Sequence, residues 1–111
     1  MPLKSSGKVY RVAGKELTLY PIGKLVEELK KAGYTRDAQT IRKWENSGVT
    51  PTALFRINGK RLYSMEQIEC YVNIAKECDI RQGLSIVDTD FPARIWEELE
   101  RVNSQYVSAA N

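Results

Sequence analysis

Two arginines, Arg56 and Arg61, could bind a phosphate together if the chain places them across a tight turn. They flank Asn58-Gly59, and this dipeptide between two apolar runs is the strongest short signal for a two-residue hairpin of type I′. Such a turn fixes the register, so Arg56 faces Arg61. Facing like charges destabilise a strand pair, and an anion between the two planar guanidiniums would remove that penalty. Alternatively, the two side chains turn apart into water.

The same register predicts the rest of the hairpin from Leu54 to Ser64. Side chains alternate between the two faces of a strand, so Phe55, Ile57 and Leu62 share the face opposite to the arginines. We expect this apolar face to pack against a core. Three further pairs face each other in this register: Ile57 with Lys60, Phe55 with Leu62, and Leu54 with Tyr63.

The chain has no histidine, which removes the commonest general base and the commonest metal ligand. Cys70 and Cys78 lie about 12 Å apart along a predicted helix, which is too far for a disulfide. Two thiols without histidine also make a poor zinc site, so we expect buried or free thiols. There is no glycine-rich phosphate loop and no paired-carboxylate motif. We therefore expect neither enzymatic activity nor a cofactor.

Positive charge is concentrated in the first part of the chain. Residues 1–63 hold 13 Lys/Arg against 5 Asp/Glu, a net +8, whereas residues 64–111 hold 4 against 9, a net −5. This asymmetry is typical of a protein that meets a polyanion with one side, although uneven charge also arises by chance. No apolar run approaches the roughly 20 residues of a membrane span, and the first residues lack a secretory signal. We expect no membrane partner and a cytoplasmic location.

The elements that position these charges follow from apolar spacing and turn residues. At 111 residues the chain is expected to form one domain after a flexible lead over residues 1–8. Two short strands are predicted before the first helix. The predicted elements are strands over 9–12 and 16–20, a helix from Pro21 to Gly33, a helix over 38–46 capped by Thr35 or Asp37 and closed by Gly48, the hairpin, a helix from a capping box at Ser64, a loop over 79–90, and a helix from Asp90 to about Val107.

The second of these helices has a polar and basic outer face. Helical spacing turns Ala38, Ile41 and either Trp44 or Glu45 inward. Its outward residues are Gln39, Thr40, Arg42 and Lys43.

The last helix carries an apolar stripe with the spacing of a heptad seam. This stripe consists of Ile95, Leu99, Val102 and Tyr106, widened by Trp96. Either the helix packs back on its own domain, which is the interpretation that we favour, or it pairs with a second copy.

Several motifs in series resemble a known DNA-binding domain over about residues 18–76. Tyr20-Pro21-Ile22-Gly23-Lys24-Leu25 resembles the opening of the mercury-resistance-regulator (MerR) type domain. The run from Thr40 to Glu45 is similar to its recognition-helix signature, with Gly48-Val49-Thr50-Pro51 as the exit. The run from Gly59 to Ser64, followed by Glu66 and Ile68, resembles its wing and the start of the next helix.

The resemblance implies a mainly helical fold with small β-hairpins. Residues 9–78 would form a winged helix-turn-helix with an N-terminal hairpin, and residues 79–111 a loop and a C-terminal helix for packing or dimerisation. The implied partner is double-stranded DNA. Its implied binding residues are Gln39 and Thr40 on base edges, Arg42 and Lys43 on phosphates, and Arg56, Lys60 and Arg61 on the wing.

Two departures from the family shape the expected function. The segment over residues 30–36 is longer than the family's tight turn, and only residues 77–111 follow the match, too few for a sensing region. The chain therefore resembles the excisionases and small regulators of mobile elements, with no small-molecule effector. We expect a sequence-specific transcriptional regulator at the nucleoid, acting as a homodimer or side-by-side oligomer. The alternatives are an excisionase-like or DNA-packaging accessory that bends its site, and a protein-interaction adaptor on the same scaffold.

Overall fold

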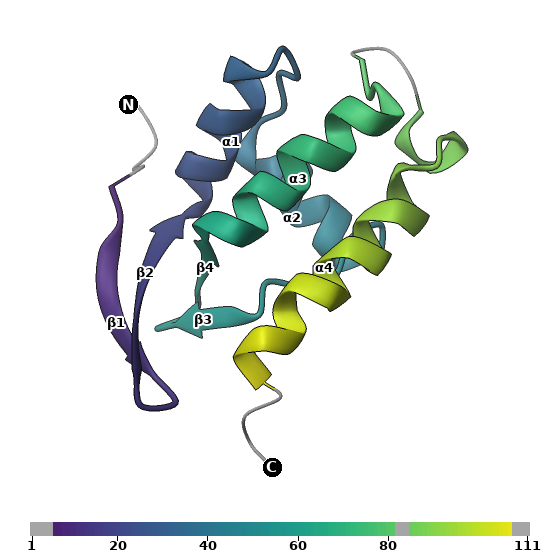
Figure 1. The fold of residues 1–111 in the computed structure, drawn as a ribbon. Helices are drawn as coiled ribbons and strands as arrows, with labels where there is room; N and C mark the ends of the chain where they lie inside the picture. Colours follow the sequence, from purple (N-terminus) through teal and green to yellow (C-terminus); the bar gives the residue numbers. More distant parts are fainter. Residues whose placement is uncertain (1–5, 82–84, 108–111) are drawn as a thin grey trace.

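The computed structural model describes residues 6–81 and 85–107, so most of the expected lead over residues 1–8 lies outside the described part. Within these ranges the chain forms a small, mixed α/β structure with one antiparallel sheet (Figure 1). The elements, in chain order, are β1 (Lys8–Val12), β2 (Lys15–Pro21), α1 (Ile22–Lys31), α2 (Ala38–Ser47), β3 (Phe55–Ile57), β4 (Lys60–Ser64), α3 (Met65–Cys78), the short 3₁₀ helix η1 (Ile86–Asp88) and α4 (Phe91–Val107).

Both predicted hairpins are confirmed, together with the register of the second one. Arg56 pairs with Arg61, Phe55 with Leu62 and Ile57 with Lys60. The turn between them has Asn58 at φ 52° and Gly59 at φ 75°, the two left-handed conformations that a type I′ turn requires. The paired register starts at Phe55, so the expected pair of Leu54 with Tyr63 lies outside it.

The two hairpins join into one four-stranded sheet in the order β1-β2-β4-β3, which the sequence did not predict. The joining strands are β2 and β4, with Tyr20 opposite Tyr63 and Pro21 opposite Leu62. Since α1 starts at Ile22, directly after β2, this pairing also fixes the start of α1 beside β4.

The helix ends confirm the predicted caps. The Tyr34 N–H donates to the Leu29 carbonyl at 2.9 Å around Gly33, which closes α1 as a Schellman motif. Asp37 Oδ1 accepts from the Thr40 N–H at 2.7 Å at the start of α2. Ser64 and Gln67 form the expected capping box at α3, and α4 begins directly after Asp90.

The core lies between α1, α2, α3 and α4. The inward residues expected on α2 are buried, including both Trp44 and Glu45. The stripe on α4 packs on its own chain, with Ile95 and Leu99 buried against α3. Within the described residues this helix therefore packs on its own domain, as in the first of the two alternatives.

The apolar face of the β3–β4 hairpin is only partly covered. Phe55 and Leu62 are buried, and the Tyr106 ring of α4 lies 5.2 Å from that of Phe55. Ile57 remains 36% exposed, which corrects the expectation that all three apolar residues face a core. The reason is its position directly before the turn, beyond the small cluster that Leu19 completes.

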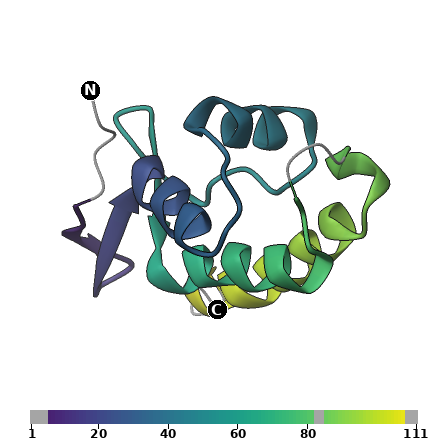
Figure 2. The ribbon, with the colours of Figure 1, turned by 90° about the horizontal axis from the view of Figure 1, so that it is seen from above.

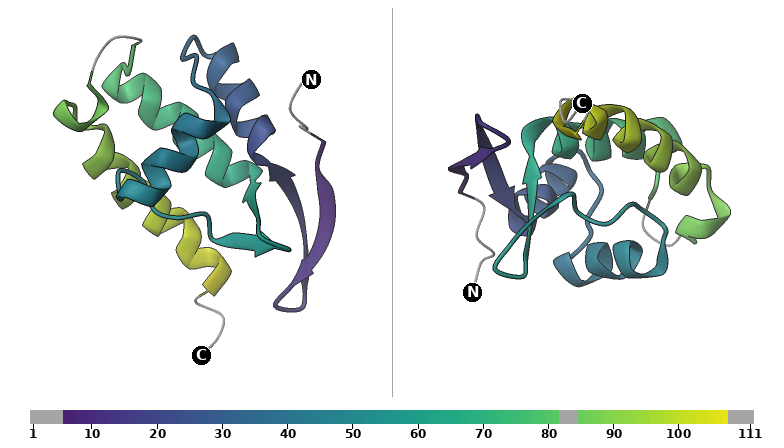
Figure 3. Two further views of the ribbon diagram at one scale, coloured as in Figure 1. Left: turned by 180° about the vertical axis from the view of Figure 1, so that it is seen from behind. Right: turned by 90° about the horizontal axis from the view of Figure 1, so that it is seen from below.

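The molecule has two sides. Seen from above, α2 and the β3–β4 turn lie on one side, and α3 and α4 cover the other, with α1 between them (Figure 2). The views from behind and from below agree, with α2 in front of the remaining helices in the first and next to the β3–β4 turn in the second (Figure 3). We call the side formed by α2 and the β3–β4 turn the α2 side.

Candidate nucleic-acid interface

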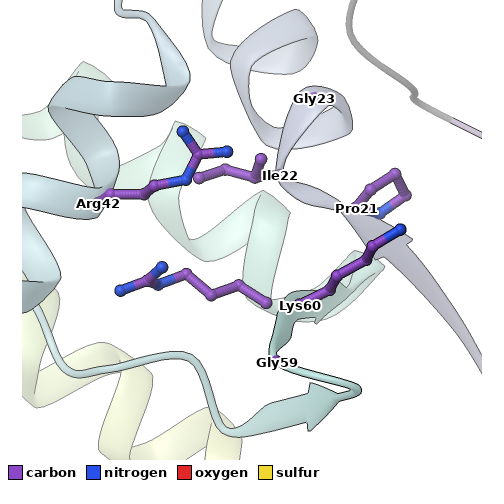
Figure 4. A pocket seen from close by; sticks show the side chains of 7 residues that line it. Pro21, Ile22, Gly23, Arg42, Gly59 and Lys60 are labelled. Atoms are coloured by element: carbon purple, nitrogen blue, oxygen red, sulfur yellow. The ribbon is translucent and has the colours of Figure 1, made fainter.

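An open hollow on the α2 side brings cationic side chains next to the start of α1. Its volume is about 280 Å³. Arg42 reaches into it from α2, and Lys60 extends from β4 toward Pro21 (Figure 4). We call this feature the basic hollow, and its lining residues are Pro21, Ile22, Gly23, Arg42, Gly59, Lys60 and Arg61.

The start of α1 adds positive potential to the basic hollow. Pro21 occupies the N-cap position and makes no side-chain cap, and the first turn holds no acidic residue. The first N–H groups of a helix have no partner within the helix, and the helix dipole makes this end favourable for anions. The helix end and the two cationic side chains therefore favour the same ligand, an anion such as a phosphate.

Arg61 is held inside the protein rather than standing free on the hairpin. Its Nε donates to Glu45 Oε1 at 2.9 Å and its guanidinium donates to Asn46 Oδ1 at 3.0 Å. Its side chain is 15% exposed, whereas Arg56 opposite belongs to the exposed residues. The carboxylate of Glu45 thus offsets the charge of Arg61, so the hairpin needs no external anion between its two arginines, and of the two only Arg56 turns into water.

Glu45 connects α2 to β4 through a buried network. Its side chain is fully buried. Oε1 also accepts from the Ala53 N–H at 2.8 Å, and Oε2 accepts from the Tyr63 hydroxyl at 2.5 Å. Burial, followed by the charge of Glu45, raises the pKa of Tyr63, so the phenol stays protonated and keeps donating. The network holds α2 and the β3–β4 hairpin in one fixed arrangement.

The outer face of α2 presents the expected polar residues to solvent. Gln39, Arg42 and Lys43 are exposed, and Thr40 is half-buried. The hydrogen bond from the Thr40 backbone N–H stabilises the Asp37 carboxylate and lowers its pKa, so the cap stays ionised. Of the residues expected to bind DNA, the structure brings Arg42, Lys60 and Arg61 together in the basic hollow. Gln39, Thr40, Lys43 and Arg56 do not line it.

Three contributions to this surface were not predicted from the sequence. The first is the start of α1, for which Pro21 and the absence of acidic residues in the first turn were the available signals. The second is the binding of Glu45 to Arg61 and Tyr63 of β4, since the sequence predicted only that Glu45 or Trp44 points inward. The third is Trp96 of α4, whose Nε1 donates to the Gly48 carbonyl at 2.9 Å at the end of α2. Nothing in the local sequence indicates this last contact.

Other kinds of site find no support in the described ranges. They contain no group of three or more His, Cys, Asp or Glu side chains placed to hold a metal ion. Cys70 and Cys78 are both free thiols, the first buried and the second half-buried, as expected. None of the described helices has the length and apolar character needed to span a bilayer.

The chain matches no family model, no curated protein and no solved structure.

Proposed function

We propose that the chain is a sequence-specific double-stranded DNA-binding protein that acts as a transcriptional regulator. In this proposal α1 and α2 form a helix-turn-helix and β3–β4 is its wing, the arrangement of the MerR-type domain. The observation that carries the proposal is the basic hollow, where Arg42, Lys60 and the start of α1 converge from three elements. Such a concentration of positive potential fits the DNA backbone.

The proposed contacts divide into phosphate binding and base reading. A backbone phosphate would occupy the basic hollow, with Arg42 and Lys60 as charged donors. The first turn of α2 would enter the major groove and present Gln39 and Thr40 to base edges. Since the Glu45 network fixes the hairpin relative to α2, Arg56 would reach the backbone next to that groove.

The opposite side of the molecule would disfavour DNA, which supports a single binding orientation. An open groove between α3 and α4 is lined by Glu66, Glu69 and Glu98, with Arg101 as the counter-charge. Glu98 is bound by Arg101, and Glu66 accepts from the Tyr106 hydroxyl. Carboxylates along this groove repel phosphate, so the α2 side is the favoured side for a polyanion.

The first experiment measures binding of a labelled mixed-sequence duplex by fluorescence anisotropy at increasing salt. Arg42→Ala and Lys60→Ala should each reduce the slope of log affinity against log salt by about one unit, because each removes one phosphate contact. Lys76→Ala is the matched control, an exposed lysine near the end of α3, and should leave the slope unchanged. Absence of binding at roughly 50 mM salt would refute the proposal.

The second experiment asks whether binding depends on sequence. Selection from a random duplex pool, followed by sequencing, should return one preferred site. The same site placed upstream of a reporter should then change its transcription when the protein is present. If the pool stays random after selection, the protein binds DNA without sequence preference, and the proposal of a specific site is wrong.

A further inference from the structure

The C-terminal end of α2 is attached to α4. The views from the front and from behind both show this end meeting α4 (Figures 1 and 3). Two contacts join the helices there. The rings of Trp44 and Phe91 pack 5.3 Å apart, and the indole Nε1 of Trp96 donates to the Gly48 carbonyl at 2.9 Å. The helix proposed to read bases is thus held by α4 at the end opposite to its base-reading residues.

These two contacts differ in how closely they fix the helix. Apolar packing between rings has little directionality, whereas a hydrogen bond weakens steeply as its angle departs from linearity. Gly48 is the C-cap residue of α2, in the left-handed conformation at φ 82°. Carbonyl groups at a helix end lack a donor within the helix, and Trp96 supplies one. The hydrogen bond therefore sets where the end of α2 lies on α4.

Trp96 makes this contact from the margin of the core. Its side chain is 38% exposed, whereas Phe91 and Ile95 on the same helix are fully buried. Those two residues hold α4 in the core without the indole. A change at Trp96 should therefore disturb the attachment of α2 more than it disturbs the packing of α4.

Two attachments together fix the direction of α2. The Glu45 network joins the helix to β4, and Trp96 joins its end to α4. A helix held to one element is freer to tilt about that point than a helix held to two. Since α2 has ten residues, a tilt of about 5° around its C-terminal end moves its first turn by about 1 Å.

A displacement of this size matters for bases and matters little for phosphates. Hydrogen bonds to base edges keep their strength only within about 0.5 Å of length, and bidentate pairs also require the right angle. Gln39 and Thr40 have short side chains and cannot follow a base that moves away. Arg42 and Lys60 have long side chains that can reach the same phosphate from a slightly shifted backbone.

We infer that Trp96 is a positioning residue for base reading: its hydrogen bond to Gly48 sets the direction of α2 and thereby the sequence preference of the protein. Trp96 acts through α2, because it belongs to α4, which covers the side opposite to the α2 side (Figure 2). This inference rests on the proposed function, in which α2 reads bases. Loss of the hydrogen bond should reduce sequence preference and leave the phosphate contacts in place.

The test measures a specificity ratio for the full chain by fluorescence anisotropy. This ratio is the affinity for the site that selection returns, divided by the affinity for a mixed-sequence duplex. Trp96→Phe keeps an aromatic ring and removes the donor. It should lower the ratio about tenfold, the loss expected when one base contact fails, and leave the slope of log affinity against log salt unchanged.

A second substitution at the same position restores the donor. The five-membered ring of histidine carries Nε2 where the five-membered ring of indole carries Nε1, so Trp96→His keeps an N–H at this place and loses only the second ring. Measured at about pH 8, where imidazole is neutral, this variant should keep most of the wild-type ratio.

Tyr106→Phe is the matched control, because it also removes one donor from an aromatic ring of α4. The Tyr106 hydroxyl donates within a network 2.7 Å from Ser64 Oγ and 2.9 Å from Glu66 Oε2, which joins α4 to the start of α3. Its loss leaves α2 attached, so the ratio should stay at the wild-type value. Urea unfolding checks that each variant folds, and Trp96→Leu is the alternative variant without a donor if Trp96→Phe does not.

Each outcome decides the inference. A lower ratio in Trp96→Phe alone, with both other variants near the wild type, would support it. A ratio unchanged in Trp96→Phe would overturn it and leave the proposed function standing. An equal fall in Tyr106→Phe would trace the loss to general destabilisation, and an equal fall in Trp96→His would trace it to ring packing; both overturn the inference. If the wild type has no preferred site, the proposed function fails and the inference fails with it.

Discussion

Replacing Glu45 by alanine should destabilise the protein far more than replacing an exposed carboxylate. The substitution removes the acceptor of the Ala53 N–H and of the buried Tyr63 hydroxyl. A buried donor left without a partner raises the free energy of the folded state by about 1–3 kcal/mol. Arg61 is 15% exposed and can turn toward water, so the loss of its ion pair adds little to this cost. We therefore expect the free energy of unfolding to fall by about 3 kcal/mol, out of a total of about 5–15 kcal/mol for a small domain.

The assay is urea unfolding followed by tryptophan fluorescence, because Trp44 is buried in the core, 5.3 Å from the Phe91 ring. Glu69→Ala removes an exposed carboxylate of α3 and should change the free energy of unfolding by less than about 0.5 kcal/mol. A loss below about 1 kcal/mol for Glu45→Ala would refute the reasoning, since it would mean that the orphaned donors find water without penalty.

A double-mutant cycle with Arg61→Ala separates the ion pair from the rest of the network. Arg61→Ala alone leaves the buried Glu45 carboxylate without its cation, a change that is costly by about 3 kcal/mol or more. The double variant Glu45→Ala/Arg61→Ala should therefore lose much less than the two single variants together. Additive losses would show that the two side chains act independently.

Three further predictions concern α2 and the hairpin. Arg56→Ala should reduce the slope of log affinity against log salt by about one unit for every duplex, and an unchanged slope would remove Arg56 from the contacts. Gln39→Ala should alter the bases recovered by site selection, whereas a uniform loss for all sequences would contradict base reading. The pKa of Asp37 lies below its ordinary value of 3.8, so its stabilisation is complete above that pH and is lost as the pH falls through the folded-state pKa. Asp37→Asn keeps a capping oxygen, but the amide does not titrate. The free energy of unfolding measured with urea should therefore fall less in acid for this variant.

Turn and cap chemistry allowed much of the fold to be predicted. Asn58-Gly59 determines its own turn type, and a two-residue turn leaves a single register for the strands beside it. Gly48 and the Ser64 capping box mark helix ends through local hydrogen bonds. These interactions join residues within a few positions of each other, so the sequence carries the whole signal.

The interactions that could not be predicted from the sequence join residues that are far apart along the chain. The pairing of β2 with β4 brings Pro21 opposite Leu62, and no local pattern distinguishes it from two separate hairpins. Glu45 was expected only as one of two inward candidates, because helical spacing does not reveal the arginine and tyrosine that bind it from β4. The basic hollow depends on both of these long-range features, which is why only its cationic side chains were predicted.

The absence of a linker between β2 and α1 limits how this chain can change in length. β2 ends at Pro21 and α1 starts at Ile22. One residue inserted at this junction would rotate the helix by about 100° and advance it by about 1.5 Å relative to the sheet. Leu25 and Leu29 would then leave the core, and the helix end would turn away from Arg42. Insertions and deletions are therefore expected to be tolerated at the Ala13-Gly14 turn and excluded where strand becomes helix.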